Sequence, residues 1–514
     1  MTKRTRIFLT VAGSILLLGT VAFVWLAAHI PVVSLLPVVG AQTPVTFSEH
    51  VAPILFTNCT SCHRPGEAAP FSLLGYKDAR PLARAIAAAT ASRSMPPWKA
   101  GPGDYAFANE RRLTPDQIRT IERWVADGAL EGDPAKLPLL PPFTEGWQLG
   151  RPDLVVSMAE PFEVPAKGAD VYRSFVVPLN LDRDVWVRAV DFRPSARAVV
   201  HHSLFFLDST GAARERDDDD PAPGFSGGMG GVAGLGGRRN GLGGLLGGGG
   251  AGRGAGRGAA AAAPTGLEQV VTGAGGLGGW ALGGRAVELP DGLAFFVPKG
   301  ADLILSTHFH PSGKAESERS TVGLYFASAP PTQAFTGIQL PPIFGVLEGL
   351  DIPAGESRYT LTDSFVLPID VKAFGVGAHA HYLGKTMTLM ATLPDGTTKN
   401  LLSIPDWDFA WQERYAYSEF VSLPKGTRLN ATVTFDNSAA NRRNPISPPV
   451  RVTWGEESND EMGSVTLQVV AARPGELPQL QQAMAAHIRA AALSRPGLTQ
   501  LLLRRAASGR RGRP

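Results

Sequence analysis

Both cysteines of the chain lie in one pentapeptide, Cys59-Thr60-Ser61-Cys62-His63, and its 514 residues contain no other thiol. Two thiolates at this spacing can add across the two vinyl groups of one porphyrin, and the adjacent histidine can then ligate the iron. A disulfide or a pair of zinc ligands is the alternative, but no further cysteine could complete a zinc site. The pentapeptide therefore predicts one covalent haem c, bound through Cys59, Cys62 and His63.

Met95 is the candidate for the second axial ligand of this haem. It follows His63 at a separation typical of a small cytochrome c, and a thioether ligand would raise the reduction potential. Two prolines come directly after it and favour an extended loop, although a buried core methionine is the alternative. Helices are predicted over residues 80–91 and from Thr114 through Trp124, as expected for a compact helical haem domain.

The N-terminal segment predicts export. Lys3, Arg4 and Arg6 precede an uncharged apolar stretch from Ile7 to about residue 30, long enough to cross a bilayer as one helix with the N-terminus inside. A signal peptide cleaved before about residue 42 is the competing interpretation. In both cases the rest of the chain lies outside the cytoplasm, held at the cell membrane or released to the periplasm.

The pattern after residue 150 changes from helical to short alternating strands separated by Pro and Gly turns. The predicted fold class is therefore multidomain, with an all-α domain followed by two all-β sandwiches of jelly-roll type. The predicted units are an anchor or signal peptide (1–42), a cytochrome c-like domain (43–145), two β-sandwiches (150–325 and 326–475) and a helical, basic tail (476–514).

A glycine-dominated run from about residue 224 to 276 interrupts the first sandwich and predicts a flexible insertion, because this composition supplies no packed core. The preceding Asp217-Asp218-Asp219-Asp220 suggests either a calcium site or a solvated acidic turn. Five arginines between residues 504 and 513 predict a solvated tail. The net charge of +3 gives no indication of a nucleic-acid partner.

Six of the ten histidines fall into three groups, His201-His202, His308-Phe309-His310 and His379-Ala380-His381. Side chains at positions i and i+2 of a strand share a face, so each HxH can present two imidazoles to one metal. Adjacent residues point to opposite faces, so the first pair can join one site only at a strand end, at a bulge, or through different ring nitrogens. Imidazole sites without thiolate suit copper or zinc, and an added thioether favours copper.

Four segments, taken in order, resemble the copper motifs of the type II copper, ascorbate-dependent monooxygenases, the family of peptidylglycine α-hydroxylating and dopamine β-monooxygenases. They are residues 199–203, 303–311, 377–385 and 459–462. The resemblance implies that His201, His202 and His308 bind an electron-transfer copper in the first sandwich. It implies that His379, His381 and Met462 bind the catalytic, oxygen-activating copper in the second.

His310 has no role in that assignment and is an alternative ligand, an outer hydrogen-bond partner or a surface residue. Met462 could also be an ordinary core methionine. Two features depart from the family. Its secreted animal members are held by disulfides, whereas both cysteines here belong to the haem motif, and its members take electrons from ascorbate, whereas this chain carries its own haem motif.

The resemblance implies insertion of one oxygen atom of O2 into a C–H bond of a substrate that the sequence does not identify. We expect the fused haem to relay electrons to the first copper from an external donor, which could be ascorbate, a quinol-linked protein or another cytochrome. The alternative is an exported haem and copper protein for electron transfer or copper handling, without hydroxylase activity. A nitrite reductase is disfavoured, because it needs a cysteine-bound blue copper and no cysteine remains outside the haem motif. A zinc hydrolase is disfavoured, because the chain has no glutamate placed as a general base in an HExxH motif.

Overall fold

The computed structural model describes residues 43–67, 69–143, 146–168, 170–226, 276–281, 284–455 and 458–494. The predicted N-terminal anchor, almost all of the glycine-rich insertion and the basic tail lie outside the described residues. Within the described part of the chain, no helix is long and apolar enough to cross a membrane.

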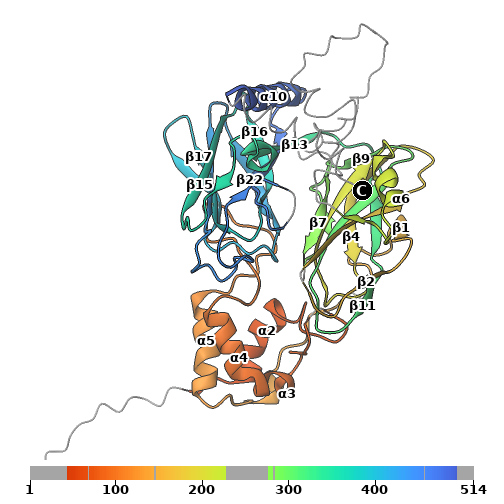
Figure 1. Cartoon of the computed structure of the whole chain (residues 1–514). Coiled ribbons are helices and arrows are strands. Elements are labelled where there is room, and N and C mark those ends of the chain that lie inside the picture. Colours follow the sequence, from red (N-terminus) through yellow and green to blue (C-terminus); the bar gives the residue numbers. More distant parts are fainter. Residues whose placement is uncertain are drawn as a thin grey trace, which may run out of the picture. The chain divides into compact units, whose positions relative to one another are not determined.

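A helical unit forms the N-terminal part (Figure 1). Its elements are η1 (Phe47–Val51), α2 (Ala52–Asn58), α3 (Tyr76–Ala79), η2 (Arg80–Leu82), α4 (Ala83–Ala91), α5 (Pro115–Ala126) and η3 (Pro134–Lys136). Helix α5 begins with a capping box, in which the Thr114 hydroxyl accepts from the Gln117 backbone N–H and the Gln117 side chain accepts from the Thr114 N–H. Its inner face buries Ile121 and Trp124 completely. Both predicted helices are therefore present.

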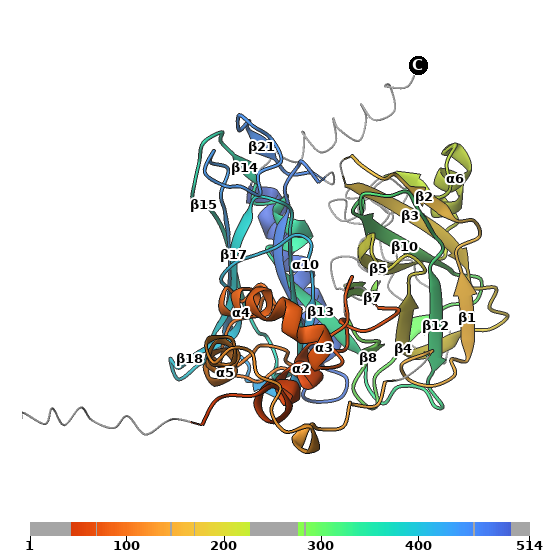
Figure 2. The ribbon, with the colours of Figure 1, turned by 90° about the horizontal axis from the view of Figure 1, so that it is seen from below.

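The first sandwich consists of two antiparallel five-stranded sheets. One sheet contains β1 (Leu154–Ser157), β12 (Thr321–Phe326), β4 (Val185–Arg193) and β8 (Val287–Glu288), with β9 (Phe295–Val297) also on β4. The other has the order β6 (Phe225–Ser226), β3 (Val171–Pro178), β10 (Asp302–Phe309), β5 (Val200–Asp208) and β7 (Gly276–Ala281). Figure 2 shows β10 beside β5, the pair that carries the first histidine group. A short ribbon, β2 (Phe162–Val164) with β11 (Glu316–Glu318), completes the unit.

The tetra-aspartate run lies at the end of α6 (Ala212–Asp219). Asp220 follows the helix, and its Oδ1 accepts a hydrogen bond of 2.9 Å from the Arg173 guanidinium. The same guanidinium donates to the carbonyls of Ala222 (3.0 Å) and Pro223 (2.9 Å). The Arg173 guanidinium thus meets the oxygens just before the glycine-rich insertion.

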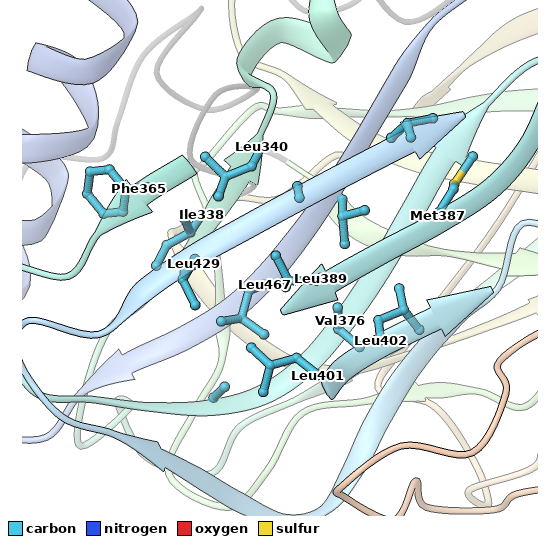
Figure 3. Packing of buried hydrophobic residues seen from close by; sticks show 14 of the residues in the cluster. Ile338, Leu340, Phe365, Val376, Met387, Leu389, Leu401, Leu402, Leu429 and Leu467 are labelled. Atoms are coloured by element: carbon cyan, nitrogen blue, oxygen red, sulfur yellow. The ribbon is translucent and has the colours of Figure 1, made fainter. Parts of the chain in front are cut away.

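The second sandwich consists of two four-stranded antiparallel sheets. The first has the order β13 (Phe335–Leu340), β22 (Gly463–Ala471), β16 (Val371–Ala380) and β19 (Arg414–Leu423), and the second β15 (Tyr359–Val366), β20 (Arg428–Phe435), β17 (Gly384–Thr392) and β18 (Thr398–Ile404). Figure 3 shows apolar side chains of both sheets, among them Val376, Leu389, Leu429 and Leu467, meeting between the layers. The remaining elements are the ribbon β14 (Asp351–Ile352) with β21 (Val452–Thr453), the turn η4 (Pro342–Gly345) and α10 (Leu477–Ser494).

The β-rich part of the predicted fold is confirmed, because two sandwiches follow the helical unit. Neither sandwich contains a cysteine, so no disulfide holds them. Their cores depend on packing alone. Helix α10 also packs onto the second sandwich, where Leu480 and Met484 join its core and Ile488 contacts a small cluster that includes Ile343 and Leu347.

Candidate metal centre

A β-bulge explains how the adjacent pair His201-His202 can serve one site. Strands β5 and β10 are antiparallel, and His202 lies opposite His308. The next pair is Phe309 with Val200, so His201 is the extra residue of the bulge. A bulge is one of the three arrangements that the sequence leaves open, and here it brings the His201 ring to the same strand end as His308.

The rings of this first histidine group are close together. Ring centroids are 4.9 Å apart for His202 and His308, 5.1 Å for His201 and His308, and 4.9 Å for His201 and His310. The Nδ1 atoms of His202 and His308 are 3.4 Å apart, and the buried Nδ1 of His201 has no hydrogen-bond partner among the described residues. Two nitrogens bound at about 2.0 Å to one tetrahedral ion would be about 3.3 Å apart, so the Nδ1 atoms fit a shared ion.

Asp170 is the functional residue that sequence reasoning missed. Its Oδ2 lies 2.8 Å from Nε2 of His308, and its Oδ1 lies 2.7 Å from Nδ1 of His310. Tyr382 of the second sandwich donates to the same Oδ2 at 2.6 Å. Burial alone would raise the pKa of Asp170, but the hydrogen bonds from His308 and Tyr382 outweigh it and hold the pKa well below its usual value.

This carboxylate sets the roles of two histidines. Because His308 donates its Nε2 proton to Asp170, its Nδ1 is the nitrogen that would face a metal, as in sites where a carboxylate orients a metal-binding imidazole. His310 is half-exposed and contacts the same carboxylate, the contact expected of an outer hydrogen-bond partner; its role stays a prediction. Asp170 carries no motif and lies far from His308 in sequence, so no sequence signal could have identified it.

The second group forms where two paired strands end. Ala380 at the end of β16 pairs with Gly463 at the start of β22, so His381 and Met462 leave this ladder side by side. His379 donates from Nδ1 to Oε1 of Gln412 at 2.6 Å, and its buried Nε2 has no hydrogen-bond partner within the described part of the chain. His381 donates from Nδ1 to the Asp460 carbonyl at 3.1 Å. In His379, Nε2 is therefore the nitrogen left for a metal.

Glu461 holds the backbone of this second group. Its buried carboxylate accepts the backbone N–H groups of His381, Leu383 (2.8 Å) and Met462 (2.8 Å). Burial outweighs these hydrogen bonds and raises the pKa of Glu461 to about 8. A single side chain therefore ties the turn after β16 to the segment before β22.

Both groups open on one cavity of about 40 Å³. Its walls come from the two sandwiches and include Tyr172, His202, His308, His379, His381, Phe409, Gln412 and Met462. Burial lowers the pKa of both His201 and His379 to about 4, so these rings are neutral near pH 7, as metal ligands must be. Five of the six residues assigned to two separate coppers thus line a shared space; the sixth, His201, lies behind His308 and is not part of its wall.

The donor atoms are not yet arranged as a finished coordination sphere. No three His, Cys, Asp or Glu side chains of the described ranges converge on a point in the way that a bound ion requires. What fits a metal is the chemistry of the set: neutral buried imidazoles, ring nitrogens without partners, outer carboxylates and one thioether.

The haem motif forms a tight turn at the end of α2. The backbone N–H groups of Cys62 and His63 both donate to the Cys59 carbonyl, at 3.1 and 2.9 Å. Both thiols are free, and burial raises the pKa of Cys59 to about 12. The buried Nδ1 of His63 has no hydrogen-bond partner among the described residues, and its ring lies 4.5 Å from that of Phe71. Two unpaired thiols one turn apart beside such an imidazole fit covalent haem attachment.

Met95 lies in the loop between α4 and α5. It is 39% exposed, so the alternative of a buried core methionine is wrong. No hydrogen bond or ring contact within the described residues joins it to His63. Its role as an axial ligand stays a prediction.

Comparison with known proteins gives no relative that bears on this site. No protein-family model matches the chain. No curated protein matches it. Among solved structures, the VP2 subviral particle of infectious bursal disease virus is 10% identical over 66% of this chain and 76% of that one, with a TM-score of 0.18. PBCV-1 VP54, fitted into a reconstruction of the virophage Sputnik, is 7% identical over 64% of this chain and 95% of that one, with a TM-score of 0.19. These similarities are too low to indicate a shared fold or function.

Proposed function

We propose that the chain is an exported copper-dependent monooxygenase that hydroxylates a C–H bond with O2 and carries its own haem c. The observation that supports this most is the shared cavity, on which two histidine groups and the thioether of Met462 converge from different sandwiches. An acidic side chain also supports each group: Asp170 contacts the ring of His308, and Glu461 accepts the backbone N–H of His381.

Two separate sets of side chains would bind two copper ions. Nδ1 atoms of His201, His202 and His308 would hold one copper, and Nε2 atoms of His379 and His381 with the sulfur of Met462 would hold the other. Bound copper supplies one-electron redox chemistry and activation of O2. A soft thioether favours Cu(I), the state that reacts with O2, so Met462 suits the oxygen-activating site.

The size of the cavity limits what can react in this arrangement. About 40 Å³ accommodates a water molecule or O2, whereas sites for organic ligands commonly reach about 300–1,000 Å³. We therefore expect the contacts between the sandwiches, such as Tyr382 to Asp170 and Gln412 to His202, to give way when substrate binds.

The haem motif supplies a built-in redox centre outside the cytoplasm. Cys59 and Cys62 would carry the porphyrin and His63 the iron, with Met95 as the expected second axial ligand. Attachment of haem c takes place outside the bacterial cytoplasm, in agreement with the predicted N-terminal anchor or signal. An external donor, which could be ascorbate, a quinol-linked protein or another cytochrome, would reduce it.

Metal and haem analysis of the full chain, expressed with cytochrome maturation, tests the proposal. We expect two coppers and one haem per chain, and loss of one copper in each of the variants His308→Ala and His379→Ala. O2 consumption coupled to hydroxylation of a candidate substrate would then establish the chemistry. A chain that binds haem but no copper would contradict the proposal.

The small cavity also favours a second candidate, an exported copper-handling or electron-transfer protein. In that case copper and haem would be bound and would exchange electrons, but O2 would not be consumed with any substrate. Measurement of the O2 uptake of the fully reduced, copper-loaded protein distinguishes the two.

A further inference from the structure

The segment from Trp98 to Ala108 attaches the helical unit to the second sandwich. Backbone hydrogen bonds join Gly101 to Ser403 (2.7 Å), Ala108 to Ala416 (2.8 Å) and Ser418 to Ala106 (3.0 Å). The side chains of Ala100 and Phe107 are buried in the core of the second sandwich. The attachment thus combines an isolated antiparallel bridge between Phe107 and Tyr417, a separate backbone bond at Gly101 and apolar burial.

Two cations of the same region hold residues 405–413, which connect β18 to β19 and are called the connecting loop here. Arg111 donates to both carboxylate oxygens of Glu413, at 2.9 and 2.8 Å, and Lys99 lies 3.2 Å from Asp408. Arg111 also donates to the Pro97 carbonyl at 3.2 Å, in the loop of the predicted haem ligand Met95. The helical unit therefore contacts the connecting loop through two ion pairs, at Asp408 and at Glu413.

The other side of the connecting loop forms part of the metal cavity. Gln412, next to Glu413, bonds to Nδ1 of His379 at 2.6 Å and lies 3.3 Å from Nε2 of His202. The ring of Phe409 lies 5.2 Å from that of His381 and 5.5 Å from that of His308. One short loop thus contacts the helical unit and both histidine groups.

The helical unit also meets the first sandwich, but less directly. Glu67, close to the haem motif, forms an ion pair with Arg197, four residues before His201. The turn and backbone between Arg197 and His201 separate this contact from the imidazoles. By contrast, Glu413 is adjacent to a residue whose side chain is bonded to His379.

We propose that electrons enter the cavity through the connecting loop and reach the ion at His379, His381 and Met462 first, not the ion at His201, His202 and His308. This inference rests on the proposed function. Each transfer moves one electron from ferrous haem to one cupric ion, giving ferric haem and a cuprous ion. An external one-electron donor, such as a reduced cytochrome, restores the ferrous haem. Arg111, Glu413 and Gln412 are positioning residues for this transfer.

The test is anaerobic stopped-flow oxidation of ferrous haem in the full copper-loaded chain, with cupric signals followed by electron paramagnetic resonance. Haem and copper content are measured first, since a chain without two coppers and a haem would contradict the proposed function itself. Loss of a charge-assisted bond changes an equilibrium constant about tenfold or more, here the constant for holding the connecting loop against the helical unit. If transfer takes place only when the loop is held, Arg111→Gln should slow haem oxidation by up to that factor. Arg111→Lys should restore part of the rate, and the matched variant Arg197→Gln should leave it within about twofold.

Site-directed loss of each ion gives the second readout. With His201, His202 and His308 all changed to Ala, the single remaining copper should still oxidise the haem. With His379, His381 and Met462 changed to Ala, haem oxidation should be lost. If Arg111→Gln fails to fold, Gln412→Met tests the same route from inside the cavity, and it should also slow the transfer. Two results would overturn the inference while leaving the proposed function intact. One is that Arg197→Gln slows the transfer whereas Arg111→Gln and Gln412→Met do not. The other is that haem oxidation is lost in the variant without His201, His202 and His308 but not in the variant without His379, His381 and Met462.

Discussion

Replacement of Asp170 by Asn should weaken copper binding at the first histidine group and leave the second group almost unchanged. The carboxylate accepts the Nε2 proton of His308 at 2.8 Å and contacts Nδ1 of His310 at 2.7 Å. Asparagine keeps the shape, but it has no charge and can present only one oxygen, so one histidine must face an N–H donor.

The expected size follows from the geometry. Asp170 is an outer partner of one ligand, and loss of such a partner typically lowers metal affinity about 10- to 100-fold, or about 1.4–2.7 kcal/mol. Among the described residues, Asp170 accepts hydrogen bonds from His308, His310 and Tyr382 and not from His201 or His202. These two histidines should retain the ion, so the site is weakened but not abolished. The ligand nitrogen of His308 stays in place.

Competition with a copper chelator of known affinity measures the change, and electron paramagnetic resonance assigns each bound ion to its site. Asp153→Asn is the matched control, because Asp153 lies in the same sandwich and accepts a backbone N–H from Phe326 at 2.7 Å. An unchanged first-site affinity, or an equal loss at both sites, would refute the assignment of Asp170 as the orienting carboxylate of His308.

Three further predictions concern stability. Leu467→Ala opens the fully buried centre of the second sandwich and should destabilise it by about 2–5 kcal/mol in chemical denaturation, whereas a loss below about 1 kcal/mol would contradict the packing described. Thr114→Ala removes one half of the α5 capping box and should cost about 1 kcal/mol, with Thr114→Ser close to neutral. The hydrogen bond to Asp363 raises the pKa of His487 above 6.5. The stabilisation by this bond should therefore be complete below pH 6.5 and disappear as the pH rises through the raised pKa. Melting temperatures measured over this pH range should fall in the parent protein, and this fall should be absent in His487→Gln.

Local patterns in the sequence were sufficient to predict the helices and to single out the three histidine groups. The Thr114 cap and the apolar spacing through Trp124 predict α5, because both signals act within one helix. The problem of two adjacent histidines is also local, since only a few backbone arrangements allow both rings to reach one site. Of these arrangements, the structure contains the β-bulge, with His201 as the extra residue.

The parts that could not be predicted depend on tertiary contacts. Asp170 meets His308 and Tyr382 across long stretches of sequence, and a single aspartate before a strand has no distinguishing pattern. The role of Gln412 is similar, because its position follows from how β19 pairs with β16 and from how the two sandwiches meet. Periodicity reports which face of one element is buried, but not which element of another unit covers it.

The ratio of copper to haem in the purified full-length chain tests the central claim most directly. The account predicts two copper ions and one covalent haem per chain, with one ion lost in His308→Ala and the other in His379→Ala. A chain with its haem attached that binds no copper, or in which neither substitution changes the copper content, would contradict it.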